Sequence, residues 1–393
     1  MPENPLKQLK HAGQSVWFDY IRRWEMTSGH LQRLIDEDGL SGVTSNPSIF
    51  EKAIADSHDY DEEIEELAIE GKEAAQIFET LAVEDIQTAA DLFLPTYLAT
   101  DARDGYVSIE VSPALARDTQ GTIEEARRLF REVNRRNVLV KVPGTAEGLP
   151  AIERLLSEGI NINITLLFAV ERYEQVASAY LAALEKLAAD GKPLKTVASV
   201  ASFFVSRIDT LVDKQLESRL RAAVTAAEAE RVAELFGKAA IANAKLAYQR
   251  FKEIFEGERF EKLAQKGARV QRMLWASTST KNPKYPDIRY AAELIGPDTI
   301  DTMPASTMDA FRDHGEVRIS IEEGLAECGQ VMSQLAEVGI DFAAVTHKLE
   351  KQGVEAFAND YHKLLDSIEQ KRAQVVRAGK TSGTSRERSA ENR

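Results

Sequence analysis

The sequence has one cysteine, few histidines and no long apolar run. Cys328 is the single thiol among 393 residues, so an internal disulfide is excluded and a reducing compartment is indicated. The six histidines are scattered, without the helix-spaced pair typical of many metal sites, and no metal is expected. No stretch approaches the roughly 20 apolar residues of a spanning helix, and the first residues lack the pattern of a secretory signal. A cytoplasmic protein without a membrane partner is therefore predicted.

Basic residues are also in short supply. The chain has 49 Lys and Arg against 63 Asp and Glu, which gives a formal net charge of −14. A nucleic-acid-binding protein normally carries a basic face, so this balance argues against a nucleic-acid partner. Local basic pockets for phosphate remain compatible with it. No internal repeat and no Pro/Gly/Ser-rich linker interrupts the chain, which predicts a single domain over residues 1–378.

Short β-rich runs alternate with longer helical patterns. Alternation of this kind favours βαβ units and a parallel sheet. A doubly wound open sheet would more typically show an early G-x-G-x-x-G turn after a strand, and none is present. The number of strand candidates therefore predicts an α/β fold, a (β/α)8 TIM barrel with additional helices. The candidates are residues 15–19, 42–46, 106–111, 137–142, 161–167, 196–204, 270–277 and 298–303.

Two regions exceed a minimal barrel. Residues 51–100 are rich in Glu and Ala and predict several extra helices, and further helical patterns follow residue 304, at 321–337 and 354–377. A long helical stretch is also predicted from 206 to about 265. Periodicity leaves open whether the 354–377 helix covers the barrel mouth or packs on its side. Residues 379–393 show no apolar periodicity and predict a disordered tail.

Strand parity sorts the side chains of these candidates into two faces. The apolar face of a barrel strand meets the helices, and the other face points into the barrel. Polar residues of the inward face gather near the carboxyl ends of their strands, where barrel active sites are built. An antiparallel sheet with one wet face is the alternative, and the long helical segments argue against it. The inward polar residues are Asp19, Asn46, Glu110, Lys141, Asn163 and Thr165.

Lys141 stands out among them. A lysine flanked by valines is poorly solvated when charged, and a neutral amine can attack a ketone to form an iminium that lets the neighbouring C–C bond break. The alternatives are that Lys141 pairs with Glu110 or holds a phosphate electrostatically. Two carboxylates at similar depth favour the chemical role, because imine formation and C–C cleavage both need proton transfers that such a pair can divide.

Three motifs resemble the transaldolase family. They read Gly-Val-Thr-Ser-Asn-Pro-Ser-Ile-Phe at 42–50, Val-Leu-Val-Lys-Val-Pro-Gly-Thr-Ala-Glu-Gly-Leu at 138–149, and Asn-Ile-Asn-Ile-Thr-Leu-Leu-Phe at 161–168. Their order and spacing agree with a class I, Schiff-base-forming transaldolase of the long bacterial type. The resemblance covers roughly residues 10–365 and is strongest between 40 and 210. It implies catalysis without a metal or an organic cofactor.

The resemblance also implies roles for individual residues. Lys141 forms the Schiff base with the ketose, and Glu110 acts through a water molecule held by Thr165 as acid and base for imine formation and hydrolysis. Asp19 takes the proton of the donor hydroxyl as the C–C bond breaks and later returns it. Four further residues hydrogen-bond the dihydroxyacetone portion of the substrate: Thr44, Asn46, Asn163 and Ser202. Phe204 lines the pocket.

The phosphate site departs from the family pattern. Arg207, just past the sixth strand, matches the family's phosphate arginine. After the seventh strand, better-known members show Ser-x-Arg, whereas this chain reads Ser-Thr-Ser-Thr-Lys at 277–281. Ser277 matches the serine, but the arginine position is Ser279. Lys281 is therefore predicted to supply the second cation with a different reach.

Together these features predict a transaldolase of the pentose phosphate pathway. It would transfer a dihydroxyacetone unit from sedoheptulose 7-phosphate to glyceraldehyde 3-phosphate, giving erythrose 4-phosphate and fructose 6-phosphate. Its partners would be small sugar phosphates, and it would be a monomer or homodimer.

Two other activities and a non-catalytic role remain as alternatives. The nearest is a fructose-6-phosphate aldolase-like lyase, whose resemblance predicts glutamine in place of Glu110 and a much shorter chain. A non-covalent sugar-phosphate isomerase would give Lys141 only an electrostatic role. A non-catalytic barrel should have lost at least one of Asp19, Glu110 and Lys141, and all three are present.

Overall fold

A closed barrel of parallel strands forms the centre of the protein. The computed structural model describes residues 4–390, and within them eight strands pair in chain order, with β8 returning to β1. The predicted (β/α)8 fold is thus confirmed. Most boundaries differ from the prediction by one to three residues, and β2 is much shorter than expected. The strands are β1 (Gln14–Phe18), β2 (Gly42–Val43), β3 (Tyr106–Glu110), β4 (Val138–Pro143), β5 (Ile162–Leu167), β6 (Ser199–Phe204), β7 (Arg272–Ala276) and β8 (Thr299–Met303).

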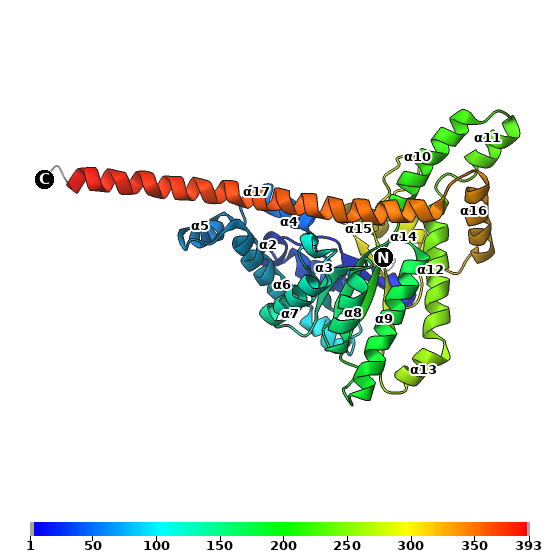
Figure 1. Ribbon diagram of the computed structural model, residues 1–393, viewed down its shortest axis with the longest axis horizontal. Helices are drawn as coiled ribbons and strands as arrows, with labels where there is room; N and C mark the ends of the chain where they lie inside the picture. The colour runs from blue at the N-terminus through cyan, green and yellow to red at the C-terminus, as the bar shows by residue number, and fades with distance from the viewer. Residues whose placement is uncertain (1–3, 391–393) are drawn as a thin grey trace.

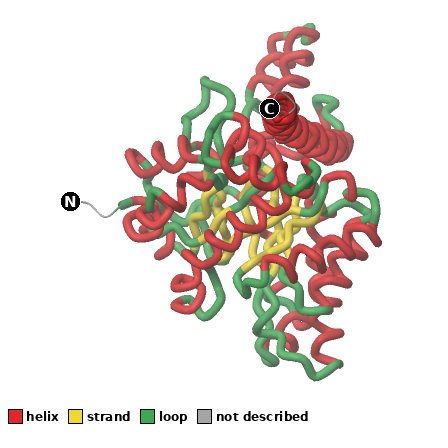
Figure 2. The backbone as a smooth tube through the Cα atoms, turned by 90° about the vertical axis from the view of Figure 1, so that its left-hand side faces the viewer, coloured by secondary structure: helices red, strands yellow, loops and turns green. Residues whose placement is uncertain are grey.

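Helices surround this barrel on its outside (Figure 2). In α7 (Thr119–Val133), the Asp118 side chain caps the first turn by accepting from the Gly121 amide, and the apolar face packs inward through residues such as Ala126 and Leu129. Apart from the two helical regions described below, the helices before or between the strands are α1 (Pro5–His11), α2 (Arg23–Thr27), α3 (His30–Asp38), η1 (Pro113–Leu115), α8 (Gly148–Ser157), α9 (Val170–Ala189) and α14 (Arg289–Glu293).

The region between β2 and β3 is helical, as predicted. It contains α4 (Pro47–Ala55), α5 (Asp61–Ile69) and the long α6 (Ala74–Ala99). These helices lie to one side of the barrel (Figure 1).

The long helical stretch predicted from residue 206 to about 265 consists of four helices: α10 (Ser206–Ala222), α11 (Ala226–Ala233), α12 (Ala239–Phe255) and α13 (Glu258–Ala264). Thr225 starts α11 with a capping box that includes Glu228. Gly237, at a φ of 67°, makes the turn before α12, a conformation that glycine adopts without strain. Local capping and turn residues therefore override the continuous helical pattern.

Three helices follow β8: α15 (Ala305–His314), α16 (Leu325–Glu337) and α17 (Phe342–Ala390). Figure 1 shows α17 as a long rod that runs across the molecule and extends beyond it. It packs against α4, α5, α6 and α10, and one stripe of buried residues faces them at mostly four-residue spacing. The stripe is Val345, Leu349, Gly353, Phe357, Leu364 and Ile368.

The predicted disorder at 379–393 differs from the structure over residues 379–390, which continue α17; residues 391–393 lie outside the described residues. Extending a helix that packing has already nucleated costs far less than starting one, so apolar periodicity is not required there. Across residues 4–390, no helix combines the length and apolar composition needed to cross a membrane.

Candidate active site

The polar residues selected by strand parity meet at the carboxyl ends of the strands. Glu110 ends β3 and lies in register with Lys141 of β4, and Lys141 lies in register with Asn163 of β5. Thr165 pairs with Pro143 two positions further along. Asp19 follows β1 directly, and its amide donates to the carbonyl of Met303. The barrel thus brings side chains from well-separated parts of the sequence into one pocket.

The motif around Lys141 is built for close packing. Val138, Val140 and Val142 are fully buried and lie on the face of β4 opposite Lys141. After β4, the chain turns into α8 through a glycine whose added Cβ would come within 2.1 Å of the Pro143 carbonyl oxygen. That glycine is Gly148, so its place in the motif has a steric cause.

Lys141 is held in a buried ion pair. Its Nζ lies 3.1 Å from Oε2 of Glu110, and the two side chains are 6% and 5% exposed. Nζ also donates to the carbonyl of Ser45 at 3.0 Å, and it lies 5.3 Å from the centre of the Phe357 ring on α17. The pair predicted as an alternative role for Lys141 therefore exists. The two charged groups are therefore in contact, although Oε2 is not in hydrogen-bond geometry with Nζ.

Glu110 and Thr165 both have unsatisfied polar atoms. Both carboxyl oxygens of Glu110 and Oγ1 of Thr165 are buried without a hydrogen-bond partner among the described residues, although Oε2 of Glu110 lies 3.1 Å from Nζ of Lys141. Burial raises the pKa of Glu110 above its ordinary value, while the positive charge of Lys141 opposes that rise. Buried polar atoms without partners are uncommon, and a site that handles water and protons is one reason to keep them.

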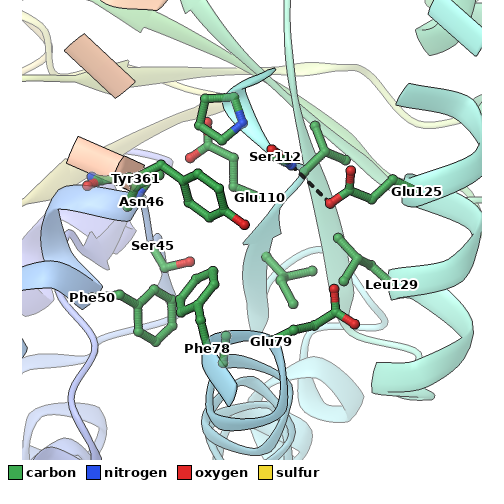
Figure 3. Close-up of a pocket in the computed structure, with 15 residues that line it drawn as sticks. Ser45, Asn46, Phe50, Phe78, Glu79, Glu110, Ser112, Glu125, Leu129 and Tyr361 are labelled. Carbon is green, nitrogen blue, oxygen red and sulfur yellow. Dashed lines mark hydrogen bonds between the residues drawn. The ribbon is translucent and has the colours of Figure 1, made fainter. Parts of the chain in front are cut away.

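A small cavity of about 40 Å³ lies beside Glu110. Its walls come from the loops after β2 and β3 and from α4, α6, α7 and α17, and Figure 3 shows the Tyr361 ring pointing into it. A second carboxylate, Glu125, lines it and accepts from the Ser112 amide at 3.1 Å. The volume is sufficient for a water molecule.

Asp19 forms a second carboxylate centre at the mouth. Its Oδ1 accepts from the Thr44 hydroxyl at 2.7 Å, and Thr44 also lies 2.7 Å from the hydroxyl of Thr302. Burial raises the pKa of Asp19, and three cations oppose the rise: Lys141, Arg207 and Lys281. Asp19 therefore lies within the electrostatic reach of both predicted phosphate cations.

Hydroxyl and amide groups form a belt inside the barrel. The Ser202 hydroxyl donates to Oδ1 of Asn163 at 2.6 Å, and the Asn163 amide donates to the Ser108 hydroxyl at 3.0 Å. Ser45 donates to the Ser108 carbonyl at 2.8 Å. Asn46 instead caps α4 by accepting from the Ile49 amide at 3.1 Å, although it stays beside Ser45 at the mouth.

Phe204 and Arg207 lie together at the start of α10. The guanidinium of Arg207 lies 5.1 Å from the centre of the Phe204 ring, within the range of a cation–π contact. Burial lowers the pKa of Arg207, and the carboxylates of Asp19 and Asp360 oppose this. Asp360 belongs to α17, so this helix covers the mouth of the barrel through both Phe357 and Asp360. The helix predicted at 354–377, whose place periodicity left open, therefore covers the mouth of the barrel.

Ser277 and Lys281 belong to the loop that follows β7. Ser277 has a left-handed φ of 58°, and its hydroxyl lies 3.0 Å from that of Ser206, the residue before Arg207. Lys281 is exposed and donates to the Ser279 hydroxyl at 2.6 Å. The loop thus brings the predicted second cation to the same side of the mouth as Arg207.

Sequence reasoning missed several residues of this pocket. Ser108 shares the inward face of β3 with Glu110, so parity alone could have included it. Thr302 lies one residue from the end of β8, and its hydroxyl could have been selected by the same parity. Phe357 is 216 residues from Lys141 and carries no local signal, because only the path of α17 brings it there.

No metal ligand set accompanies these residues. Among residues 4–375, whose side chains the structure describes, no group of three or more His, Cys, Asp or Glu is arranged to hold a metal ion. The charged side chains at the mouth are instead Asp19, Glu110, Asp360, Lys141, Arg207 and Lys281.

Comparison with known proteins agrees with this geometry. The sequence profile of the family described as Transaldolase/Fructose-6-phosphate aldolase matches residues 16–368. The chain is 46% identical over 374 residues to Transaldolase 2 of Nostoc sp., covering 94% of this chain and 98% of the relative. It is 47% identical over 364 residues to the transaldolase of Saccharopolyspora erythraea, covering 92% and 96%. The transaldolase of Thermobifida fusca is 45% identical over 371 residues, covering 94% of this chain and 99% of the relative. By the extent of these matches, the chain belongs to the transaldolase/fructose-6-phosphate aldolase family.

Proposed function

We propose that this protein is a transaldolase that moves a dihydroxyacetone unit from sedoheptulose 7-phosphate to glyceraldehyde 3-phosphate. The observation that carries the proposal is the buried Lys141–Glu110 pair, with Asp19 nearby at the mouth of the barrel. Relatives at 44–47% identity that bear the name transaldolase support transfer over simple cleavage. The presence of Glu110 supports it as well, since the aldolase subgroup is expected to have glutamine there.

Lys141 starts the reaction as a nucleophile. Its neutral amine adds to the ketone carbon of the donor, and the former carbonyl oxygen leaves as water after taking one proton from the amine and one from Glu110. The product is an iminium between Lys141 and the sugar. The orphaned oxygens of Glu110 and Thr165 support a water molecule between them as the proton carrier, and the same groups would serve the final hydrolysis.

Asp19 then controls cleavage and transfer. It removes the proton from the hydroxyl on the carbon beyond the scissile bond, the C–C electrons move to the iminium to form an enamine, and the aldehyde product leaves. The acceptor aldehyde takes its place, the enamine attacks it, and Asp19 returns the proton to the new hydroxyl. Burial raises the pKa of Asp19, and Thr44 holds its carboxylate by a hydrogen bond, so the base is both strengthened and oriented.

The interior belt is proposed to bind the three-carbon unit. Asn163 lies in register with Lys141 and accepts from the Ser202 hydroxyl, while Thr44 and Asn46 lie at the mouth. Their hydroxyl and amide groups match the hydroxyls of dihydroxyacetone, and Phe204 closes one side of the pocket.

Borohydride trapping tests the covalent step. Incubation with fructose 6-phosphate followed by reduction should leave a three-carbon adduct, located on Lys141 by peptide mass spectrometry. Lys245, which is also buried and ion-paired, serves as an internal comparison that should remain unmodified. Absence of an adduct, or its presence on another lysine, would exclude the Schiff-base mechanism and favour a non-covalent isomerase.

Arg207, Ser277 and Lys281 are proposed to hold the substrate phosphate. Replacing Lys281 with methionine should raise the KM for fructose 6-phosphate about tenfold, because one charge-assisted hydrogen bond is lost, and should change kcat little. Steady-state kinetics with fructose 6-phosphate and with unphosphorylated fructose would measure the effect. Lys284 lies exposed in the same loop, so Lys284→Met is the matched control. Equal effects of the two substitutions would remove Lys281 from the phosphate site.

The cellular setting is proposed from composition. One cysteine and a net charge of −14 support a cytoplasmic enzyme whose partners are sugar phosphates and neither nucleic acid nor membrane. A monomer or a homodimer is proposed, and sedimentation analysis would distinguish these two states.

A further inference from the structure

A buried aspartate outside the barrel interior contacts the loop that bears Ser277 and Lys281. Asp301 lies in the middle of β8, in register with Trp275 of β7, and is fully buried. Its neighbour Thr302 hydrogen-bonds to Thr44 inside the barrel. Because successive side chains of a strand point to opposite faces, Asp301 points away from that interior, toward the helices.

Asp301 is buried with a single hydrogen bond. Its Oδ1 accepts from the Thr278 hydroxyl at 2.8 Å, whereas its Oδ2 has no partner among residues 4–390. Thr278 is also fully buried. Burial raises the pKa of Asp301 to about 7, and the negative charge of Asp19 adds to the rise. A carboxyl group in such a place is costly, and leucine or valine would fit the packing demand of a barrel wall better.

Thr278 is the second residue of the loop that follows β7. Ser277, directly before it, has a φ of 58°, which is unfavourable for a residue with a side chain. The Ser206 amide donates to the Ser277 carbonyl at 3.1 Å, which ties this strained residue to the start of α10. The Thr278–Asp301 bond ties the next residue to β8 on the other side. The loop is therefore fixed from both neighbouring strand–helix units.

The direction of this loop decides where two groups of the site lie. Ser277 contacts Ser206, which precedes Arg207. Lys281 lies close enough to Asp19 for its positive charge to lower the pKa of that carboxyl. Release of Thr278 from Asp301 would let Ser277 leave its strained conformation and would move Lys281 with it. Arg207 would keep its place, because it belongs to α10.

We propose that Asp301 is a positioning residue for the substrate phosphate: through Thr278 it fixes the loop 277–281 so that Ser277 and Lys281 face the same phosphate as Arg207. The inference rests on the proposed function, and it adds residues that do not touch the substrate. It differs from a purely structural role, because it concerns the phosphate end of the substrate and leaves the Lys141 end unaffected.

Variants of Thr278 test the proposal. Thr278→Val keeps the shape of the side chain but removes the donor, whereas Thr278→Ser keeps the donor. Thr278→Val should raise the KM for fructose 6-phosphate about tenfold, with kcat and the kinetics of unphosphorylated fructose close to wild type. Thr278→Ser should restore the wild-type KM, and so should Asp301→Asn, whose amide oxygen still accepts from Thr278.

Direct binding of inorganic phosphate provides a second measurement. Calorimetry on the full chain should show weaker phosphate binding for Thr278→Val and unchanged binding for Thr278→Ser. If Thr278→Val fails to fold, Thr278→Ala takes its place in both measurements. A loss of kcat that is equal for both sugars, or an unchanged phosphate affinity, would overturn the proposal. Failure of the proposed function would show separately, as a missing Lys141 adduct with phosphate binding intact.

Discussion

Replacing Lys141 with methionine is expected to abolish transaldol transfer, with a loss in kcat on the order of 10⁴-fold or more. Methionine has a similar length and packs in apolar surroundings, but it has no nitrogen to add to the ketone, so the covalent intermediate cannot form. The belt of Asn163 and Ser202 does not involve Lys141 and should still bind the sugar. Transfer assays with sedoheptulose 7-phosphate, together with borohydride trapping, would measure the loss.

The same substitution should leave a buried charge without a partner. Burial already raises the pKa of Glu110, and removal of the positive charge of Lys141 raises it further. A carboxyl whose pKa is higher in the folded state than in the unfolded state loses stability as pH rises through that range. Lys141→Met should therefore be destabilised by about 3 kcal/mol at pH 8, and by less at pH 5.

The double variant Lys141→Met/Glu110→Gln separates inactivity from unfolding. Without a carboxyl at position 110, its stability should be close to wild type and nearly independent of the Glu110 titration, although it should remain inactive. Urea unfolding at pH 5 and pH 8 would compare the three proteins. Transfer activity in the double variant above about one hundredth of wild type would exclude Lys141 as the nucleophile.

The fold and the catalytic centre could be predicted because their signals are local. A strand period of two places Glu110, Lys141 and Asn163 on one face, and the register of β3, β4 and β5 brings them together. The N-cap Thr225 is also a local signal, but the prediction gave only a helical stretch from 206 to about 265 and did not place the break after α10. Prediction therefore succeeded for the faces of the strands and left the boundaries between these helices unplaced.

Other parts of the site depend on packing between distant segments. Phe357 reaches Lys141 only because α17 crosses the mouth of the barrel. The apolar stripe of α17 predicts which face of the helix is buried, but it does not predict which elements that face contacts. Asp301 is polar on the outward face of β8, where parity predicts an apolar residue. Its partner Thr278 becomes visible only in three dimensions. Such a local violation of pattern is itself a signal of function.

Replacing Glu110 with glutamine is expected to lower the rate of transfer about 10²- to 10⁴-fold, the range for loss of a general acid–base group. Glutamine keeps the size of the side chain but cannot carry a proton to or from the departing water. The KM for phosphorylated sugars should change little, because Arg207 and Lys281 are intact. Slower appearance of the trapped Lys141 adduct would place the defect in imine formation, and the residual reaction should shift toward simple aldol cleavage.

The pH dependence of kcat/KM should change in the same variant. Burial raises the pKa of Glu110 above 4.5, so the wild-type rate that depends on the Glu110 carboxylate should fall as pH decreases through a value above 4.5. In Glu110→Gln, the fall of kcat/KM at low pH should reflect only the titration of Asp19, whose pKa is also raised by burial.

Glu125 provides the control, since it lines the same cavity but does not pair with Lys141. Glu125→Gln should keep both the wild-type rate and the pH profile. Unchanged transfer in Glu110→Gln would remove Glu110 from its role, because no other carboxylate forms an ion pair with Lys141 among residues 4–390.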